Sequence, residues 1–202
     1  EAFLSALEQE GNNTKLAFYH ASKTALFYYF GQYKDALVQS DVTLKYADNV
    51  LGDVVEVWNA FYTALSISAN YENFDLKEKK KQRKKFKKHL KDLKLWAKGC
   101  PENYDQHYFV LMAELYSMES KFEKALQYYE KAIKAAAQNN FIYIEAIANE
   151  NAALLCEKMQ FAKQSKTYLN DAWEAYNHWG AQIKCQQLER SFPAVLASKV
   201  NP

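Results

Sequence analysis

Residues 109–136, FVLMAELYSMESKFEKALQYYEKAIKAA, carry apolar residues at three- and four-residue spacing on both sides of a short polar break, which predicts two helices joined by a turn. A weaker copy follows forty residues later. The shift places Ala113 on Ala153, Leu115 on Leu155, Tyr128 on Tyr168, Ala132 on Ala172 and Ala135 on Ala175. A self-match at this period predicts stacked helical hairpins, because one hairpin cannot bury its apolar face alone.

The composition fits an all-α fold. The chain has 202 residues, of which 49% are hydrophobic, enough for one sizeable core or a short repeat array. Five glycines and three prolines separate long segments of helical spacing, and no segment alternates apolar and polar residues as a half-buried strand would. The sequence begins at Glu1 without an initiator methionine, so we expect a fragment of a larger multidomain chain.

Cysteine usage and hydropathy favour a cytoplasmic protein. The three cysteines are odd in number and form no CxxC or Cys/His pair, which is typical of free thiols in a reducing compartment. The sequence shows no signal-peptide pattern, and it has no apolar run near the roughly 20 residues that span a bilayer. We therefore expect a cytoplasmic location.

Breaks along the sequence divide it into four predicted hairpins. Their expected ranges are about 14–50, 53–98, 103–139 and 141–179, followed by a C-terminal helix at about 181–190. Thr14 is expected to cap the first hairpin, whose second helix should run to about Asn49. Residues 99–103 form the strongest break, because Pro101 ends the helix that precedes it. We expect a single helical-repeat domain over residues 1–202.

The turn inside each hairpin has a recurring pattern. Gly31, Tyr33 and Ala36 have the G-x-Y-x-x-A spacing of a tetratricopeptide turn, in which glycine permits a tight corner and alanine lets the helices approach. Residues 120–125 repeat the pattern with serine in place of glycine, and residues 160–165 repeat it in a more degraded form. Units of about 40 residues are longer than the 34 of the standard tetratricopeptide. The predicted fold is an α-solenoid of about four tetratricopeptide-like hairpins plus flanking helices.

Three stretches are more specific than a generic repeat: 95–115 (LWAKGCPENYDQHYFVLMAEL), 129–155 (YEKAIKAAAQNNFIYIEAIANENAALL) and 175–193 (AYNHWGAQIKCQQLERSFP). They resemble the helical region of hybrid sensor kinases, in which a STAND-type ATPase, often preceded by a serine/threonine kinase-like domain, is joined by helical repeats to GAF and histidine kinase domains. The family pattern runs W-A-x-x-C-P-x-N, then Y-x-x-A-I-x-x-A with A-x-x-x-E-A-x-A-N-E, then A-x-Y-x-x-W-G-A-x-x-K-x-x-Q-L-E. The matching positions are Trp96, Ala97, Cys100, Pro101, Asn103, Tyr129, Ala132, Ile133, Ala136, Glu145, Ala146, Ala148, Asn149, Glu150, Ala172, Trp179, Gly180, Ala181, Lys184, Gln187, Leu188 and Glu189.

The resemblance covers about half of the chain and implies a connector. Asn177, His178, Cys185 and Gln186 depart from the family pattern. The sequence has no GxxxxGK[ST] phosphate loop, no kinase HRD or DFG motif and no phospho-acceptor histidine segment followed by an ATP site. We therefore expect a non-catalytic scaffold or signal-transmitting module of a two-component sensor kinase, without cofactors, that contacts domains of its own parent chain or a protein or peptide partner. The alternative is a free-standing peptide- or protein-binding repeat protein.

Residues 77–94, KEKKKQRKKFKKHLKDLK, concentrate positive charge. Their net charge is 11 minus 2, or +9, whereas the whole chain carries +2, so the remainder carries −7. An apolar stripe is expected from Leu76, Phe86, Leu90, Leu93 and Trp96, with the positive side chains on the other faces.

Three interpretations of this segment stay open: a solvated helix face, a contact surface for an acidic protein domain, and a surface for nucleic acid or acidic lipid. Ten of its eleven positive residues are lysines, which are poor at bidentate base recognition, so nucleic acid and membrane are the least favoured partners. The candidate contact residues are Lys80, Lys84, Lys87 and Lys88.

A second candidate surface follows from the repeat geometry, in which the first helix of each hairpin lines a concave face. The expected positions pair His107 with Ile147, Glu114 with Leu154 and Ser117 with Glu157, and they include Glu150. Three glutamates in such a groove would favour a basic peptide or domain, and the alternative is an ordinary polar face.

Other reactive residue types predict no site. The four histidines are scattered without an HExxH motif or a second ligand at helical spacing, so no metal is expected. Cys100 precedes a proline at a helix break, but packing is the favoured role because no nearby cation lowers its pKa. Aromatic side chains are assigned to repeat packing; these are Tyr33, Phe122, Tyr129, Tyr168, Trp173 and Trp179.

Overall fold

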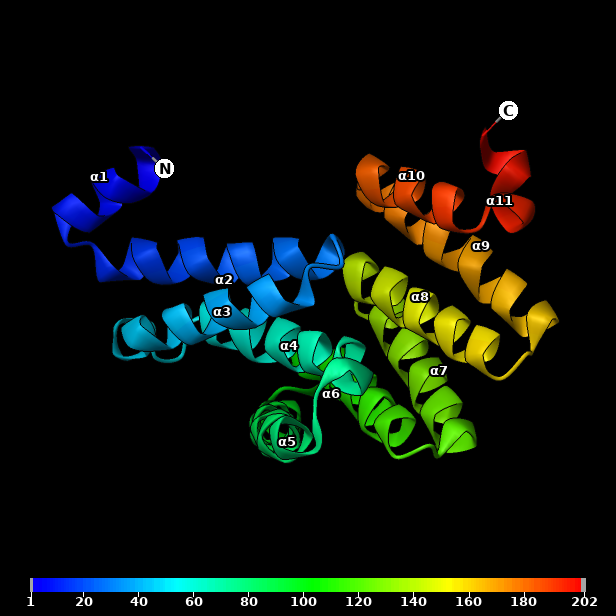
Figure 1. The fold of residues 1–202 in the computed structure, drawn as a ribbon, viewed down its shortest axis with the longest axis horizontal. Helices are drawn as coiled ribbons and strands as arrows, with labels where there is room; N and C mark the ends of the chain where they lie inside the picture. Colours follow the sequence, from blue (N-terminus) through cyan, green and yellow to red (C-terminus); the bar gives the residue numbers. More distant parts are fainter. Residues whose placement is uncertain (1, 201–202) are drawn as a thin grey trace. The chain divides into compact units, whose positions relative to one another are not determined.

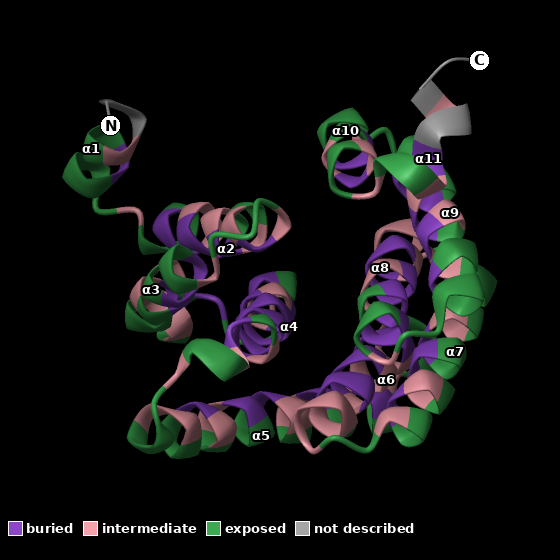
Figure 2. Ribbon diagram, turned by 45° about the vertical axis from the view of Figure 1, so that its right-hand side comes forward, coloured by how far each residue is buried: buried purple, intermediate pink, exposed green. Residues whose placement is uncertain are grey.

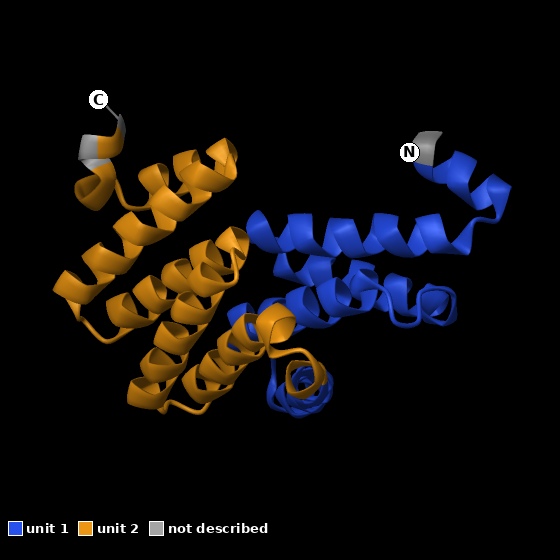
Figure 3. Cartoon of the chain, turned by 180° about the vertical axis from the view of Figure 1, so that it is seen from behind, with its two compact units in different colours: residues 1–95 blue, residues 96–202 orange. Residues whose placement is uncertain are grey.

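The computed structural model describes the backbone of residues 2–200 and the side chains of residues 4–196 and 199 (Figure 1). Over this range the chain forms eleven α-helices and two short 3-10 helices, and no strand occurs in it. Successive helices pack in antiparallel pairs, which confirms the all-α class and is consistent with a helical-repeat solenoid. The contacts divide the chain into two compact units, Glu1–Leu95 and Trp96–Pro202 (Figure 3), and each is described separately.

The second unit contains six consecutive helices in its described part, of which the first five lie close to the predicted boundaries and the last was not predicted. They are α6 (Pro101–Met118), α7 (Phe122–Gln138), α8 (Ile142–Lys158), α9 (Ala162–Trp179), α10 (Gln182–Ser191) and α11 (Pro193–Val200). Pro101 occupies the first turn of α6, where its missing N–H costs no helical hydrogen bond. Helix α6 packs on α7 and α8 packs on α9, as the predicted hairpins require.

Four turns in the described part of this unit recur at twenty-residue spacing. Ser120, Asn140, Gln160 and Gly180 each follow a helix with a positive φ, of 56°, 61°, 60° and 85° respectively. The residue after each of them donates its N–H to the carbonyl oxygen five residues earlier, at 2.8–2.9 Å. This is the Schellman hydrogen bond, which satisfies a carbonyl left unpaired at the helix end. A helix and a turn therefore occupy twenty residues, and a hairpin repeats every forty.

Burial in the two hairpins confirms the forty-residue register. Ala113 and Ala153 have no exposed surface, and neither do Ala132 and Ala172. These paired positions lie where helices contact each other, and a methyl side chain allows the close approach. The sequence repeat is thus a repeat of packing as well as of helix length.

The first unit contains four α-helices wholly within its described residues, and most of α5. The elements are α1 (Ala2–Glu10), α2 (Asn13–Tyr29), α3 (Tyr33–Thr43), the 3-10 helix η1 (Leu44–Asn49), α4 (Val54–Ala69), the 3-10 helix η2 (Tyr71–Asn73) and α5 (Leu76–Gly99). Helix α4 packs against both α2 and α3, so it is buried along nearly its whole length (Figure 2).

Two local predictions in this unit need correction. The helix expected to run to Asn49 is α-helical only to Thr43 and continues as η1. The cap of α2 is Asn12, whose side chain accepts the Lys15 N–H at 3.0 Å, whereas Thr14 donates its hydroxyl to the carbonyl of Asn49. Asparagine is at least as good a cap as threonine, and it precedes the helix by the required spacing.

Helix α5 buries a face that only partly coincides with the predicted apolar stripe. Its buried positions within the first unit follow helical spacing: Gln82, Phe86, His89 and Leu93. Leu76 is 82% exposed and lies outside this stripe. Phe86 and Leu93 are buried as predicted, but the polar Gln82 and His89 share the buried face, so apolar spacing alone identified only part of it.

Candidate functional site

Glu114 of the second unit fastens three helices together. It lies on α6 at 8% exposure, and its Oε1 accepts a hydrogen bond from Tyr129 Oη on α7 at 2.6 Å. The same oxygen accepts a second hydrogen bond from Asn151 Nδ2 on α8 at 2.8 Å. A buried carboxylate needs such donors, because an unpaired charge away from water is costly. Glu114 therefore joins its own hairpin to the next one.

Glu150 repeats this arrangement one hairpin further along. It lies on α8, where Oε2 accepts a hydrogen bond from Tyr176 Oη on α9 at 2.6 Å. Its Oε1 accepts a charge-assisted hydrogen bond from Lys184 Nζ on α10 at 2.7 Å, and the lysine is 8% exposed. We call these two groups the Glu114 clamp and the Glu150 clamp. Each links a first helix to its partner and to the following helix.

The residues predicted for the concave surface differ in burial. His107, Glu114 and Ile147 are buried, and the first two form hydrogen bonds with side chains of neighbouring helices. Ser117 and Glu150 are half-buried, whereas Leu154 and Glu157 are exposed. Contact of these residues with a partner stays a prediction, and only Glu157 among the three glutamates is exposed.

His107 belongs to an aromatic cluster inside the second unit. Its Nε2 lies 3.1 Å from Tyr143 Oη, and its ring meets those of Phe141 and Tyr104. Burial lowers the pKa of His107 from 6.5 to about 4 and raises that of Tyr143 from 10 to about 12. Both side chains are therefore neutral at pH 7, as expected of packing residues. Trp179, which contacts Tyr143, is the half-exposed edge of the cluster.

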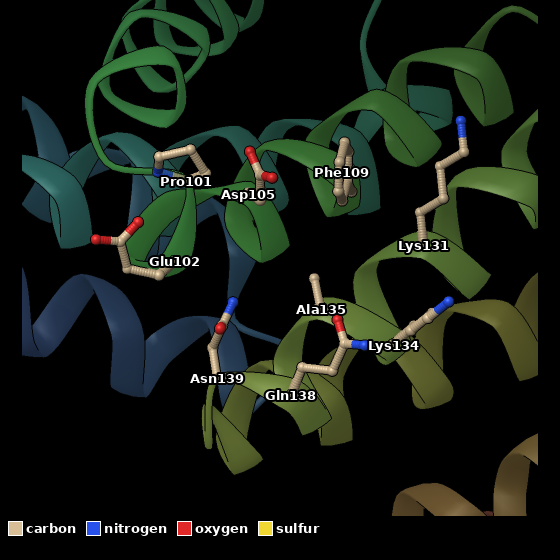
Figure 4. A pocket seen from close by; sticks show the side chains of 9 residues that line it. All are labelled: Pro101, Glu102, Asp105, Phe109, Lys131, Lys134, Ala135, Gln138 and Asn139. Carbon is tan, nitrogen blue, oxygen red and sulfur yellow. The ribbon is translucent and has the colours of Figure 1, made fainter.

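A groove of about 430 Å³ lies between α6 and α7 (Figure 4). Glu102 and Asp105 line it from the start of α6, whereas Lys131 and Lys134 come from α7 and point away from the two acids. Burial, then the charge of Glu102, raises the pKa of Asp105. The opposite charges do not converge on one point, so the groove lacks the focused polar groups of a small-molecule site.

The candidate lysines of α5 form an exposed surface. Lys80, Lys84, Lys87 and Lys88 are all exposed, and no acidic oxygen of the described residues lies within 4.0 Å of their Nζ atoms. The structure thus brings the four predicted contact residues together on one helix, in the first unit.

The three cysteine thiols all have raised pKa values. Burial raises the pKa of Cys156 and Cys185, and loss of solvation with the nearby Glu102 raises that of Cys100. Thiols shifted in this direction are weaker nucleophiles at neutral pH. Across the described residues, no group of three or more His, Cys, Asp and Glu side chains could hold a metal ion.

Sequence reasoning did not find the clamp donors. Tyr129, Asn151, Tyr176 and Lys184 lie 15 to 37 residues from the glutamates that they contact. No local motif marks such pairs. The position of Glu114 and Glu150 on the inner face of a first helix, opposite a tyrosine on the second, was the available signal.

Comparison with known proteins adds no family assignment. No protein-family model matches the chain, and no curated protein matches it. Among the described helices, none combines the length and the apolar composition needed to cross a bilayer.

Proposed function

We propose that this chain is a non-catalytic helical-repeat module that holds protein domains and transmits movement between them. The observation that supports the proposal is the pair of clamps in the second unit. Each glutamate ties a first helix to the second helix of its hairpin and to the first helix of the next one. In a repeat array each hairpin contacts mainly its neighbours, so such ties decide how well a displacement at one end reaches the other.

The resemblance of residues 95–193 to hybrid sensor kinases supports a more specific role. Glu150 and Lys184 match the family pattern in two separate blocks of sequence, and in this chain they form an ion pair at 2.7 Å. A pattern whose positions meet across a helix contact is what a mechanical connector requires. We propose a cytoplasmic module that joins the ATPase and kinase domains of a two-component sensor.

Nucleotide chemistry tests the non-catalytic part of the proposal. We expect residues 1–202 neither to hydrolyse ATP nor to transfer its phosphate to their own side chains. The measurement is phosphate release and incorporation of labelled phosphate, with heat-unfolded chain as the blank. Hydrolysis above the blank that disappears on substitution of a single polar side chain would contradict the proposal.

The coding context separates the connector from the free-standing binder. A reading frame that continues on both sides into an ATPase and a kinase supports the connector. A frame that encodes only these residues favours a free-standing peptide- or protein-binding repeat protein, in which the same clamps hold a rigid binding surface.

A further inference from the structure

The outer face of α5 is an uninterrupted row of lysines. We define the lysine face as Lys77, Lys80, Lys84, Lys87, Lys88 and Lys91, all exposed. The spacing of three or four residues places them on one side of the helix, opposite the buried stripe that contains Phe86 and Leu93. With a rise of about 1.5 Å per residue, lysines of the row that are three or four residues apart in sequence are about 4.5–6 Å apart along the axis.

The lysine face is not neutralised by the rest of its unit. Lys79 and Lys85, on the flanks of the same helix, pair with Glu72 at 2.8 Å and with Asp41 at 2.6 Å. None of the six lysines of the lysine face has such an ion pair among the described residues. Like charges three and four residues apart weaken a helix, so α5 carries a repulsion that a bound anion would relieve.

We propose that the lysine face docks an acidic helical segment of a partner protein. The inference rests on the proposed function, because it names the partner of a module that holds other proteins. A partner helix with glutamates at the same three- and four-residue spacing presents carboxylates at the same intervals as the lysines. Exposed Leu76 (82%) and Leu95 (68%) stand near the two ends of the row and supply apolar contacts for leucines at the ends of such a partner helix.

The same geometry disfavours the other polyanions. A helix that binds a membrane surface inserts its apolar face, but Phe86 and Leu93 are fully buried inside the protein. Single-stranded nucleic acid is held by aromatic side chains on which bases stack, and the lysine face contains none. It also contains no arginine, the residue that binds phosphate through two parallel hydrogen bonds.

Fluorescence anisotropy with a labelled peptide tests the docking surface. The probe is a helical peptide with glutamates at three- and four-residue spacing and a leucine at each end, compared with a peptide of the same composition in scrambled order. A single-stranded oligonucleotide of equal charge and vesicles rich in phosphatidylserine are the competing polyanions. We expect the ordered peptide to bind more tightly than the other three probes. Its affinity should fall as the salt concentration is raised.

Matched variants locate the binding surface. Replacing Lys80, Lys84, Lys87 and Lys91 together with glutamine removes four charges from the lysine face. The control replaces four exposed lysines elsewhere, Lys34, Lys45, Lys163 and Lys166. We expect the first variant to lose about tenfold or more in affinity for the ordered peptide, since four exposed ion pairs are lost. We expect the control to bind as the unsubstituted chain does.

Three results would overturn the proposal. Equal loss in the two variants would mean net charge alone attracts the peptide. Equal binding of the scrambled peptide would show that the spacing of the glutamates along the partner helix does not matter. Tighter binding of the oligonucleotide or of the vesicles would show that the partner is a nucleic acid or a membrane. ATP hydrolysis is measured on the same samples, so failed docking without hydrolysis leaves the connector proposal standing, whereas hydrolysis contradicts that proposal independently of docking.

Discussion

Gln160 adopts a backbone conformation that glycine adopts more easily. Its φ of 60° lies in the left-handed region, where Gly180 ends the next helix at 85°. A side chain in this backbone region costs about 1–2 kcal/mol of stability. Glycine removes that cost, but its greater conformational entropy in the unfolded chain cancels part of the gain. We expect Gln160→Gly to raise the free energy of unfolding by about 0.5–1 kcal/mol, measured by urea denaturation.

The matched control places the same substitution inside a helix. Gln164 is exposed in the first turn of α9, where glycine is unfavourable by up to about 1 kcal/mol. Gln164→Gly should therefore destabilise the chain. Destabilisation by both substitutions would show that the turn conformation is not under strain at Gln160.

His89 makes the stability of the first unit depend on pH. Burial, reinforced by Lys85 and Lys88 and opposed by Asp41, lowers its pKa from 6.5 to about 3. The unfolded chain therefore takes up this proton first as the pH falls, so stability is retained above pH 6.5 and lost between 6.5 and 3. The loss is about 1.4 kcal/mol per pH unit, or about 2 kcal/mol at pH 5.

The change in stability between pH 7 and pH 5 is the measurement that isolates the contribution of His89. Urea midpoints of His89→Leu should fall less over this interval than those of the unsubstituted chain. His178, which is exposed on α9, provides the control substitution His178→Leu. The same pH slope in all three proteins would contradict the assigned role of the buried ring.

At the scale of single elements, the sequence predicted helix ends better than helix faces. The ends in the second unit follow from turns whose polar or glycine residues have a clear conformational reason, such as Gly180 and Asn140. The face of α5 followed only in part: Phe86 and Leu93 are buried as predicted, and the polar Gln82 and His89 are buried beside them. Periodicity identifies a helix, but the neighbouring helices decide which side is covered.

The Glu150 clamp should hold α10 on the repeat stack. Lys184 and Tyr176 both donate to the same carboxylate, and the ion pair is only 10% and 16% exposed at its two side chains. Removing Lys184 leaves the Glu150 carboxylate without its cation and with Tyr176 as a remaining donor, at a cost of about 1–3 kcal/mol. We expect Lys184→Met to accelerate amide hydrogen exchange in α10, with little change in α6 and α7.

Amide hydrogen exchange in a variant that carries both substitutions distinguishes the effect of the ion pair from that of side-chain packing. Glu150→Gln should also loosen α10, and combining it with Lys184→Met should add less than the sum of the two effects, because both act on one contact. Lys163→Met, at an exposed site on α9, is the control. Additive effects of the two clamp substitutions would contradict their coupling.

At the scale of the whole molecule, the repeat was predictable and the contacts of Glu114 were not. The forty-residue offset is visible in the sequence because small residues such as Ala132 and Ala172 recur where helices meet. The burial of Glu114 depends on Tyr129 and Asn151, which reach it from two other helices. Spacing along one chain segment contains no information about such contacts, so the forty-residue register alone did not show that Glu114 is buried.

The same repeat predicts how far a disturbance should spread. Ala132 on α7 and Ala172 on α9 have no exposed surface, so leucine at either position overpacks a helix contact by about 1–3 kcal/mol. That is a large part of a typical stability of about 5–15 kcal/mol. We expect Ala132→Leu and Ala172→Leu to lower the denaturation midpoint clearly, while Lys84→Ala, on the exposed side of α5, changes it little.

The location of the effect tests the division of the chain. Each unit encloses its own buried side chains, for example Phe61 in the first and Leu169 in the second. Hydrogen exchange should therefore accelerate around α7 to α9 in the two leucine variants and stay unchanged in α2 and α4. Equal acceleration throughout would mean that the two units unfold as one. Negligible effects of both leucines would place Ala132 and Ala172 outside the tight helix contacts, and the forty-residue register would then not be a register of packing.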